Sequence, residues 1–411
     1  MKFNIITLGC KVNTYESNFM KESLITNGFS FCEETSKCDL IVINTCSVTD
    51  TSDKKSLKTV RRARRENPNA VLVVCGCSTQ NNIEPYKNLG IDIILGNKDK
   101  SKIVDLVTKY LNDKEKYEYI TKERSLPFED MEITKFDHVR AFIKVQDGCN
   151  NFCSYCIIPY VRGDLRCKSF EKVICEVTNL AKNGYKEIVL TGIHTGSYND
   201  NGRDLCDLID GISGIEGIER IRLSSVEITE LNEKFMNLLK TNKKFCNHLH
   251  VPLQSGCDEI LKVMNRKYDT DYYRNKIKEI REICPDISIT TDVIVGHNYE
   301  TDELFNKVCA FCKEINFAKI HVFPYSKRTG TATSRMPEEV SEQVKKERAR
   351  TLINISDELE KNYYDKFIGK ELDVLIETNE NGQSVGHTSN YLRVVLNEDL
   401  EVNKIYQRKI N

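Results

Sequence analysis

The sequence lacks long hydrophobic runs and any large excess of charge of one sign. No run approaches the roughly 18 consecutive apolar residues of a membrane-spanning helix, so a membrane span is excluded. Lys and Arg together number 60 and Asp and Glu 61, which gives a formal net charge of −1. A globally basic nucleic-acid-binding protein is therefore excluded, and any site for a polyanion has to be a local patch.

The N-terminal residues also lack the pattern of an export signal. Their apolar stretch is short and soon gives way to polar residues, so a cytoplasmic protein is expected. Cysteine, by contrast, is abundant, with 17 among 411 residues. A reducing compartment disfavours disulfides, so we expect some cysteines to be metal ligands and the others to be ordinary core residues.

Short β-branched runs alternate with amphipathic helical patterns along most of the chain. In residues 1–112 this alternation predicts an N-terminal parallel α/β domain. Residues 113–134 are rich in charge and show no regular spacing of hydrophobic residues, which is typical of a linker. Residues 135–364 repeat the strand–helix pattern and predict a partial (β/α)6 barrel. Residues 367–411 have short strand patterns joined by Asn and Gly turns, which predict a small all-β module.

The expected strands follow the β-branched runs. In the N-terminal domain they cover 3–8, 40–44, 70–74 and 91–95. In the barrel they cover 139–145, 187–191, 220–224, 248–253, 288–295 and 319–323. In the C-terminal module they cover 372–377, 391–396 and 405–409. The clearest helical patterns cover 15–27, 52–66 and 341–363.

Three cysteines share one short segment after the first expected barrel strand: Cys149, Cys153 and Cys156. Three thiolates on a compact loop can hold an iron–sulfur cluster and leave its fourth iron without a protein ligand. A zinc site requires four ligands, and no fourth Cys or His follows closely. The spacing therefore favours a cluster over zinc and over three incidental thiols.

Cys10, Cys46 and Cys77 each follow the carboxyl end of an expected parallel strand. Ligand sites in open α/β sheets gather at those ends, so these thiols could converge on one centre. Spacing alone leaves three unrelated core thiols as the alternative. Cys309 and Cys312 have the spacing of a redox pair but fall inside a helical pattern, so we interpret both as core residues.

One helical segment, 54–65, carries seven basic residues and no acidic one. Its positive charge collects on one face, at Lys54, Lys58, Arg61, Arg62 and Arg65. A basic stripe on a near-neutral protein predicts a surface that contacts phosphates. The alternative is a merely solvated helix face.

The loop Cys-Asn-Asn-Phe-Cys-Ser-Tyr-Cys resembles that of the radical S-adenosylmethionine (SAM) superfamily. The resemblance implies that SAM binds the open iron and is cleaved to a 5′-deoxyadenosyl radical. It also implies that Gly192 and Gln254, after the second and fourth barrel strands, line the cofactor pocket. No residue is assigned as a general acid or base, because in this chemistry the protein positions the reactants and excludes water rather than transferring protons.

The upstream cysteines lie in the strings Leu-Gly-Cys-Lys-Val-Asn, Asn-Thr-Cys-Ser-Val-Thr and Cys-Gly-Cys-Ser-Thr-Gln. With the barrel and the C-terminal module, these strings resemble the methylthiotransferase family over essentially the whole chain. The resemblance implies that Cys10, Cys46 and Cys77 hold a second [4Fe–4S] cluster and that Cys75 is not a ligand. It also implies a TRAM-like domain at 367–411, shorter than is usual.

Within that family, the strings 8–13, 61–68 and 321–326 are similar to the branch that acts on threonylcarbamoyladenosine in tRNA. The resemblance implies 2-methylthiolation at position 37 of the anticodon stem-loop, with an electron donor and a sulfur source as further partners. The alternatives are a sister enzyme acting on isopentenyl-adenosine or a ribosomal-protein aspartate, or a non-catalytic, metal-stabilised RNA-binding protein. One departure is His297-Asn298-Tyr299-Glu300, where the family usually has Phe-Pro-Gly-Glu.

Overall fold

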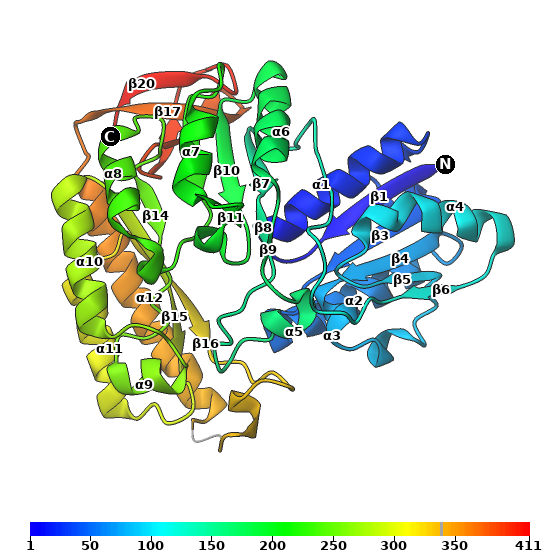
Figure 1. The fold of residues 1–411 in the computed structure, drawn as a ribbon, viewed down its shortest axis with the longest axis horizontal. Helices are drawn as coiled ribbons and strands as arrows, with labels where there is room; N and C mark the ends of the chain where they lie inside the picture. Colours follow the sequence, from blue (N-terminus) through cyan, green and yellow to red (C-terminus); the bar gives the residue numbers. More distant parts are fainter. Residues whose placement is uncertain (338–339) are drawn as a thin grey trace.

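The computed structural model of the protein describes residues 1–337 and 340–411. An N-terminal α/β body, a central half-barrel and a C-terminal antiparallel sheet follow one another along the chain (Figure 1). The α/β fold class with an all-β C-terminal module is therefore confirmed. None of the helices in these two ranges combines the length and apolar character needed to cross a bilayer.

The N-terminal body is built on one parallel sheet with the strand order β2-β1-β3-β4-β5-β6. Its strands are β1 (Lys2–Thr7), β2 (Ser30–Phe31), β3 (Leu40–Thr45), β4 (Val71–Gly76), β5 (Ile93–Leu95) and β6 (Tyr117–Tyr119). Its helices are α1 (Lys11–Thr26), α2 (Asp50–Glu66), α3 (Cys77–Asn81) and α4 (Ile103–Asp113). Apolar residues of α1 and α4 pack on one face of the sheet and those of α2 on the other.

The half-barrel is formed by two three-stranded parallel sheets, β13-β10-β7 and β14-β15-β16, which a bridge between Ile221 and Phe245 joins. The strands are β7 (Arg140–Lys144), β10 (Glu187–Thr191), β13 (Arg220–Leu223), β14 (His248–His250), β15 (Ser288–Val295) and β16 (Lys319–Pro324). The shorter strands are β8 (Gln146–Asp147), β9 (Arg166–Cys167), β11 (Asn199–Asp200) and β12 (Arg203–Asp204). All six long strands lie where the β-branched runs predict them.

Helices cover the outer wall of the half-barrel (Figure 1). They are α6 (Phe170–Lys182), α7 (Leu205–Ser213), α8 (Glu233–Thr241), α9 (Asp258–Val263), α10 (Thr270–Ile283), α11 (Asp302–Ile315) and α12 (Glu342–Asp365), whereas α5 (Ile158–Arg162) packs against α3 of the N-terminal body. The C-terminal sheet has the order β19-β18-β17-β20. Its strands are β17 (Glu371–Glu380), β18 (Gln383–Thr388), β19 (Arg393–Leu396) and β20 (Ile405–Lys409).

Several strands lie outside the expected ones: the two-residue strands β2, β8, β9, β11 and β12, and the longer strands β6 and β18. β6 falls in the segment 113–134, which the composition marks as a linker, and it pairs with β5 at the sheet edge. Edge strands are half solvated and tolerate charge, so hydrophobic period is a weak signal there. Met131 and Ile133 of the same segment are buried in the barrel core. β18 was likewise missed because Gly386 and His387 interrupt its apolar pattern.

A buried ionic network joins the N-terminal body to the half-barrel. Glu16 of α1 is fully buried and accepts hydrogen bonds from Lys100, from Lys144 Nζ at 2.7 Å and from Arg162 Nη1 at 3.0 Å. Asp147 also binds Lys144 and Arg162. Burial alone would raise the pKa of Glu16, but these cations outweigh burial and hold that pKa well below its usual range. The interface therefore depends on an ionised Glu16.

We expect Glu16→Ala to lower the free energy of unfolding by about 3–5 kcal/mol, because it leaves buried cations without a counter-charge. Since the pKa of Glu16 is lowered, its contribution exists above the ordinary carboxyl pKa and is lost only in strong acid. Thermal and urea unfolding near neutral pH measures the effect. Glu282→Ala, an exposed site on α10, is the matched control and should change stability by less than about 0.5 kcal/mol. Equal stability of the two variants would contradict the prediction.

Candidate active site

A large cavity of about 1360 Å³ lies where the three parts of the chain meet. The N-terminal body, the half-barrel and the C-terminal sheet all contribute lining residues. The cavity brings together all eight residues that the sequence predicts for cofactor and cluster binding: Cys10, Cys46, Cys77, Cys149, Cys153, Cys156, Gly192 and Gln254.

The first group of thiols comes from three loops at the carboxyl ends of neighbouring parallel strands. Cys10 follows β1 and precedes the first turn of α1, Cys46 follows β3, and Cys77 follows β4 and opens α3. Gly9 allows the close approach: a Cβ built on it would lie 2.9 Å from Cys46 Sγ, and its φ is +110°. Burial, and then the nearby Cys46 and Cys10 thiols, raise the pKa of Cys77 to about 11. These three thiols therefore lie within electrostatic reach of one another.

The second group lies on the loop between β8 and α5. Phe152 in this loop has a left-handed φ of +47°, which turns the chain between the cysteines. Burial, and then the Cys153 and Cys149 thiols, raise the pKa of Cys156 to about 12. The loop therefore gathers its three thiols beside the cavity.

Each group of three thiols has buried cationic neighbours. Arg162 is fully buried, and Cys77 and Cys10 are among the groups that raise its pKa. Arg266 Nη1 donates to Cys153 Sγ at 3.3 Å. His194 Nδ1 lies 3.9 Å from Cys149 Sγ. Thiolates that ligate a cluster carry negative charge, and such hydrogen bonds and charges stabilise it.

The thiol groups fit clusters better than single ions. In the described ranges, no three His, Cys, Asp or Glu side chains converge closely enough to hold one metal ion. The ligands of a multi-iron cluster stand farther apart than those of a single ion. With a cavity between them and cations behind them, both groups have the donor set that a [4Fe–4S] cluster requires.

His194 is linked to the cluster loop through a short polar chain. Its Nε2 lies 2.7 Å from Glu230 Oε1, and Ser197 Oγ also donates to Glu230. Burial lowers the pKa of His194, but contacts with Cys149 and Glu230 outweigh burial and raise that pKa to about 10. His194 is therefore a cation beside Cys149.

Gly192 and Gln254 line the cavity in different ways. A Cβ on Gly192 would lie 2.9 Å from Gln146 Oε1, which accepts from the backbone of Ile193 and His194. Packing inside the protein thus already requires glycine at this position. Gln254 has a left-handed φ of +65° and bridges to Val293 of β15. Such strain in a non-glycine residue is typical of functional sites.

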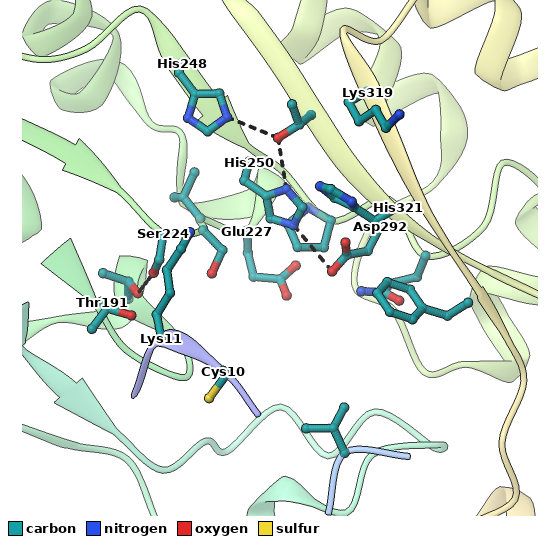
Figure 2. Close-up of a pocket in the computed structure, with 18 of the residues that line it drawn as sticks. Cys10, Lys11, Thr191, Ser224, Glu227, His248, His250, Asp292, Lys319 and His321 are labelled. Atoms are coloured by element: carbon teal, nitrogen blue, oxygen red, sulfur yellow. Dashed lines mark hydrogen bonds and ion pairs between the residues drawn. The ribbon is translucent and has the colours of Figure 1, made fainter. Parts of the chain in front are cut away.

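The part of the cavity farther from the cluster loop is rich in histidine, which sequence reasoning missed (Figure 2). His248 and His250 lie two residues apart on β14 and face the same side of the sheet. His248 Nε2 and His250 Nδ1 both contact Thr290 Oγ1, at 3.2 and 3.0 Å. His250 Nε2 lies 3.3 Å from Asp292 Oδ2. The period-2 spacing on a strand was the available signal.

Three thiols outside the two groups, Cys75, Cys309 and Cys312, lie in or beside hydrophobic cores. Cys75, two residues before Cys77, is fully buried. It lies on the face of β4 that packs against α1 and α4. Cys312 is fully buried and Cys309 partly buried in the middle of α11, beside the barrel core. Burial raises the pKa of Cys309 to about 11, so neither its place nor its acidity is that of a reactive thiol.

The loop that departs from the family pattern packs against the cluster loop. His297 is fully buried, and its ring lies 6.4 Å from that of Tyr155 and 4.9 Å from that of Tyr325. Burial lowers the pKa of His297 to about 4, so the imidazole is neutral. Glu300 pairs with Arg348 of α12 at 2.9 Å. The neutral His297 ring of this loop therefore packs against Tyr155 of the cysteine loop.

Two family models match the chain. Residues 2–96 match the "Uncharacterized protein family UPF0004", and residues 143–312 match the radical SAM superfamily. The first range contains Cys10, Cys46 and Cys77, and the second contains Cys149, Cys153 and Cys156.

Curated proteins are similar to the chain over almost its whole length. The threonylcarbamoyladenosine tRNA methylthiotransferase MtaB of Bacillus subtilis is 39% identical over 98% of this chain and 92% of its own. The protein of the same name from Aquifex aeolicus is 37% identical over 92% and 93%. The tRNA-2-methylthio-N(6)-dimethylallyladenosine synthase of Thermodesulfovibrio yellowstonii is 34% identical over 99% and 95%.

Among solved structures, the radical SAM methyltransferase TsrM from Kitasatospora setae, with cobalamin and a [4Fe–4S] cluster bound, has a TM-score of 0.60. It is 13% identical, and the match covers 81% of this chain and 76% of that one. This similarity shows a shared fold.

Proposed function

This chain belongs to the radical SAM methylthiotransferase family, and from that premise we propose that it converts N6-threonylcarbamoyladenosine in tRNA to its 2-methylthio derivative. The observation that carries the proposal is that two groups of three thiols, from two different domains, open into one cavity. A reaction that activates C2 of the adenine and delivers sulfur to it needs two such centres within reach of one base. The strings 8–13, 61–68 and 321–326 support the threonylcarbamoyl branch over its sisters.

In this proposal, Cys149, Cys153 and Cys156 hold one [4Fe–4S] cluster, and Cys10, Cys46 and Cys77 hold the other. When bound, the first cluster supplies the electron that cleaves SAM, and the second supplies the site for sulfur, which a further SAM methylates. Gly192 and Gln254 line the cofactor side of the cavity. The residues of the chain position the base, exclude water and stabilise the thiolates. An electron donor and a sulfur source complete the reaction.

The domain boundaries in this proposal follow the sequence analysis. Residues 1–112 would be the methylthiotransferase domain, 113–134 the connection, 135–364 the radical SAM core and 367–411 the TRAM-like module. The matched ranges of the two family models, 2–96 and 143–312, lie inside the first and third of these.

We also assign the anticodon stem-loop to the exposed face of α2. Lys58 and Arg61 are exposed and have no ion-pair partner among the described residues, whereas Lys54 pairs with Asp50 and Arg62 with Glu66. The helix starts at the cavity rim, because Val48, two residues before it, lines the cavity. A stem-loop whose base enters the cavity would bring its phosphates past this face.

We expect Lys58→Gln/Arg61→Gln to weaken binding of the anticodon hairpin about 5- to 20-fold and to reduce the slope of log K against log[salt] by roughly 1–2. Loss of two phosphate contacts releases fewer counterions, which is why both quantities fall together. Fluorescence anisotropy over a salt series measures them. Lys278→Gln/Lys313→Gln removes the same charge from exposed sites on α10 and α11 and is the matched control. An unchanged slope in the α2 variant would exclude α2 as the RNA-binding face.

The experiment that tests the proposed function is nucleoside mass spectrometry of total tRNA from cells with and without the gene. Loss of the 2-methylthio form of threonylcarbamoyladenosine, with accumulation of its precursor, is the expected result. Loss of the 2-methylthio isopentenyl nucleoside instead would assign the chain to the sister reaction. Unchanged tRNA nucleosides would exclude both and direct attention to ribosomal protein.

A further inference from the structure

The cavity contains a partly buried lysine without a counter-charge, whereas its other cations that lack an ion pair among the described residues, Lys361 and Arg393, are exposed. Lys11, the first residue of α1, extends its side chain into the cavity beside Cys10 (Figure 2). Among the described residues, no carboxylate pairs with its ammonium group. Its electrostatic neighbours are Tyr391, two arginines and the Cys10 thiol. A partly buried ammonium without a partner costs free energy, which an anionic ligand would recover.

Tyr391, in the turn between β18 and β19, lines the same cavity and is one of the electrostatic neighbours of Lys11. Its ring stacks between His248 at 4.6 Å and His387 at 4.9 Å, measured between ring centroids. The guanidinium groups of Arg222 and Arg140 lie 4.8 and 5.2 Å from the ring centroid. Tyr391 has a left-handed φ of +67°, a strained conformation for an aromatic residue that persists where the surroundings impose it.

Each of the two arginines behind Tyr391 already has a carboxylate partner within the protein, and Arg222 shares its partner Glu187 with Arg220. Arg222 pairs with Glu187 at 2.7 Å, and Arg140 pairs with Glu377 at 3.0 Å. They fix the ring and its hydroxyl, and burial keeps their charges from being screened. Lys11 is therefore the partly buried cation at this end of the cavity that lacks a carboxylate partner among the described residues.

We infer that Lys11 and Tyr391 form the subsite for the carboxylate of the substrate's threonylcarbamoyl group. The inference rests on the proposed function and adds to it the feature of the base that the cavity recognises. In adenine, N1 separates C6, which bears the N6 substituent, from C2, which receives the sulfur. The N6 substituent therefore starts on the side of the base that also receives the sulfur, and the group that binds its carboxylate has to lie in the same cavity as the sulfur-delivering centre. Lys11 meets this condition because it is the neighbour of Cys10.

The same subsite would select against the sister substrate. An isopentenyl substituent is apolar and carries no acceptor for Lys11 or for the Tyr391 hydroxyl. Binding it would leave a desolvated ammonium unpaired, and polar sites reject such analogues far more strongly than apolar pockets do. Discrimination between the two branches would thus depend on one salt bridge and one hydroxyl.

The test compares two RNA hairpins, one with threonylcarbamoyladenosine and one with its methyl ester, in which the carboxylate is neutral. We expect Lys11→Gln to lower kcat/KM for the acid hairpin about 10- to 100-fold and to leave the value for the ester nearly unchanged. Lys11→Arg should restore part of the difference. Iron content and the electron paramagnetic resonance spectra of both clusters should match those of the wild-type protein, since Cys10 itself is intact.

Tyr391→Phe gives an independent test, because it lies far from Cys10 in sequence and removes only a hydroxyl. We expect Tyr391→Phe to lower kcat/KM for the acid hairpin about 3- to 10-fold and to leave kcat/KM for the ester hairpin nearly unchanged. Lys278→Gln is the matched control for charge. Equal losses of kcat/KM on both hairpins would overturn the inference and assign Lys11 to an RNA phosphate. No loss on either hairpin would also overturn the inference, because Lys11 would then contribute to neither contact. A wild-type protein that modifies neither hairpin would instead refute the proposed function.

Discussion

Cys149→Ala is expected to abolish SAM cleavage and to lower the iron content from about eight to about four atoms per chain. With two thiols left, the loop can no longer hold a cluster, and the other cysteines that line the cavity belong to the N-terminal group. Formation of 5′-deoxyadenosine under reducing, anaerobic conditions measures the effect, and the loss should exceed about 1000-fold. The thiols of Cys10, Cys46 and Cys77 lie on other loops, so their cluster should remain.

The matched control is Cys175→Ala, which removes an exposed thiol on α6. It should keep both clusters and full cleavage activity. Wild-type rates of SAM cleavage in Cys149→Ala would exclude the loop as the cluster site. Tightly bound zinc in the wild-type protein prepared without oxygen, in place of iron, would favour the non-catalytic alternative.

Cys46→Ala is expected to separate the two half-reactions. The variant should still cleave SAM, because the Cys149, Cys153 and Cys156 loop is untouched, yet it should form no methylthiolated product on a hairpin substrate. Iron should again fall by about half. Simultaneous measurement of 5′-deoxyadenosine and of the modified nucleoside distinguishes this outcome from general loss of activity.

Cys75→Ala is the control for that variant, because Cys75 lies next to the site in sequence but faces the opposite core. It should retain both clusters and both products. If Cys75→Ala lost a cluster while Cys46→Ala kept both, the assignment of ligands in the N-terminal body would be wrong.

The sequence by itself determined the fold class, four of the six strands of the N-terminal body and the six long strands of the half-barrel. Buried parallel strands form unbroken β-branched runs, and the helices between them carry the 3.6-residue period, so both signals are local. The position of the thiols after strands was also readable, because parallel topology brings the carboxyl ends of strands to one edge. Edge strands such as β6 were missed, since half-solvated residues show little pattern.

Only the tertiary structure decided which groups from distant segments face one another. Glu16 and Lys144, which lie 128 residues apart, meet in a buried network that no local pattern reveals. Tyr391 comes from the turn between β18 and β19 and lines the same cavity as Lys11, so residues near both ends of the chain contribute to one cavity. Charge pairing and packing across domains depend on three-dimensional proximity, and one sequence records only the order of residues along the chain. Local sequence patterns therefore revealed the cysteines of the site, whereas the groups that surround these cysteines became apparent only in the folded protein.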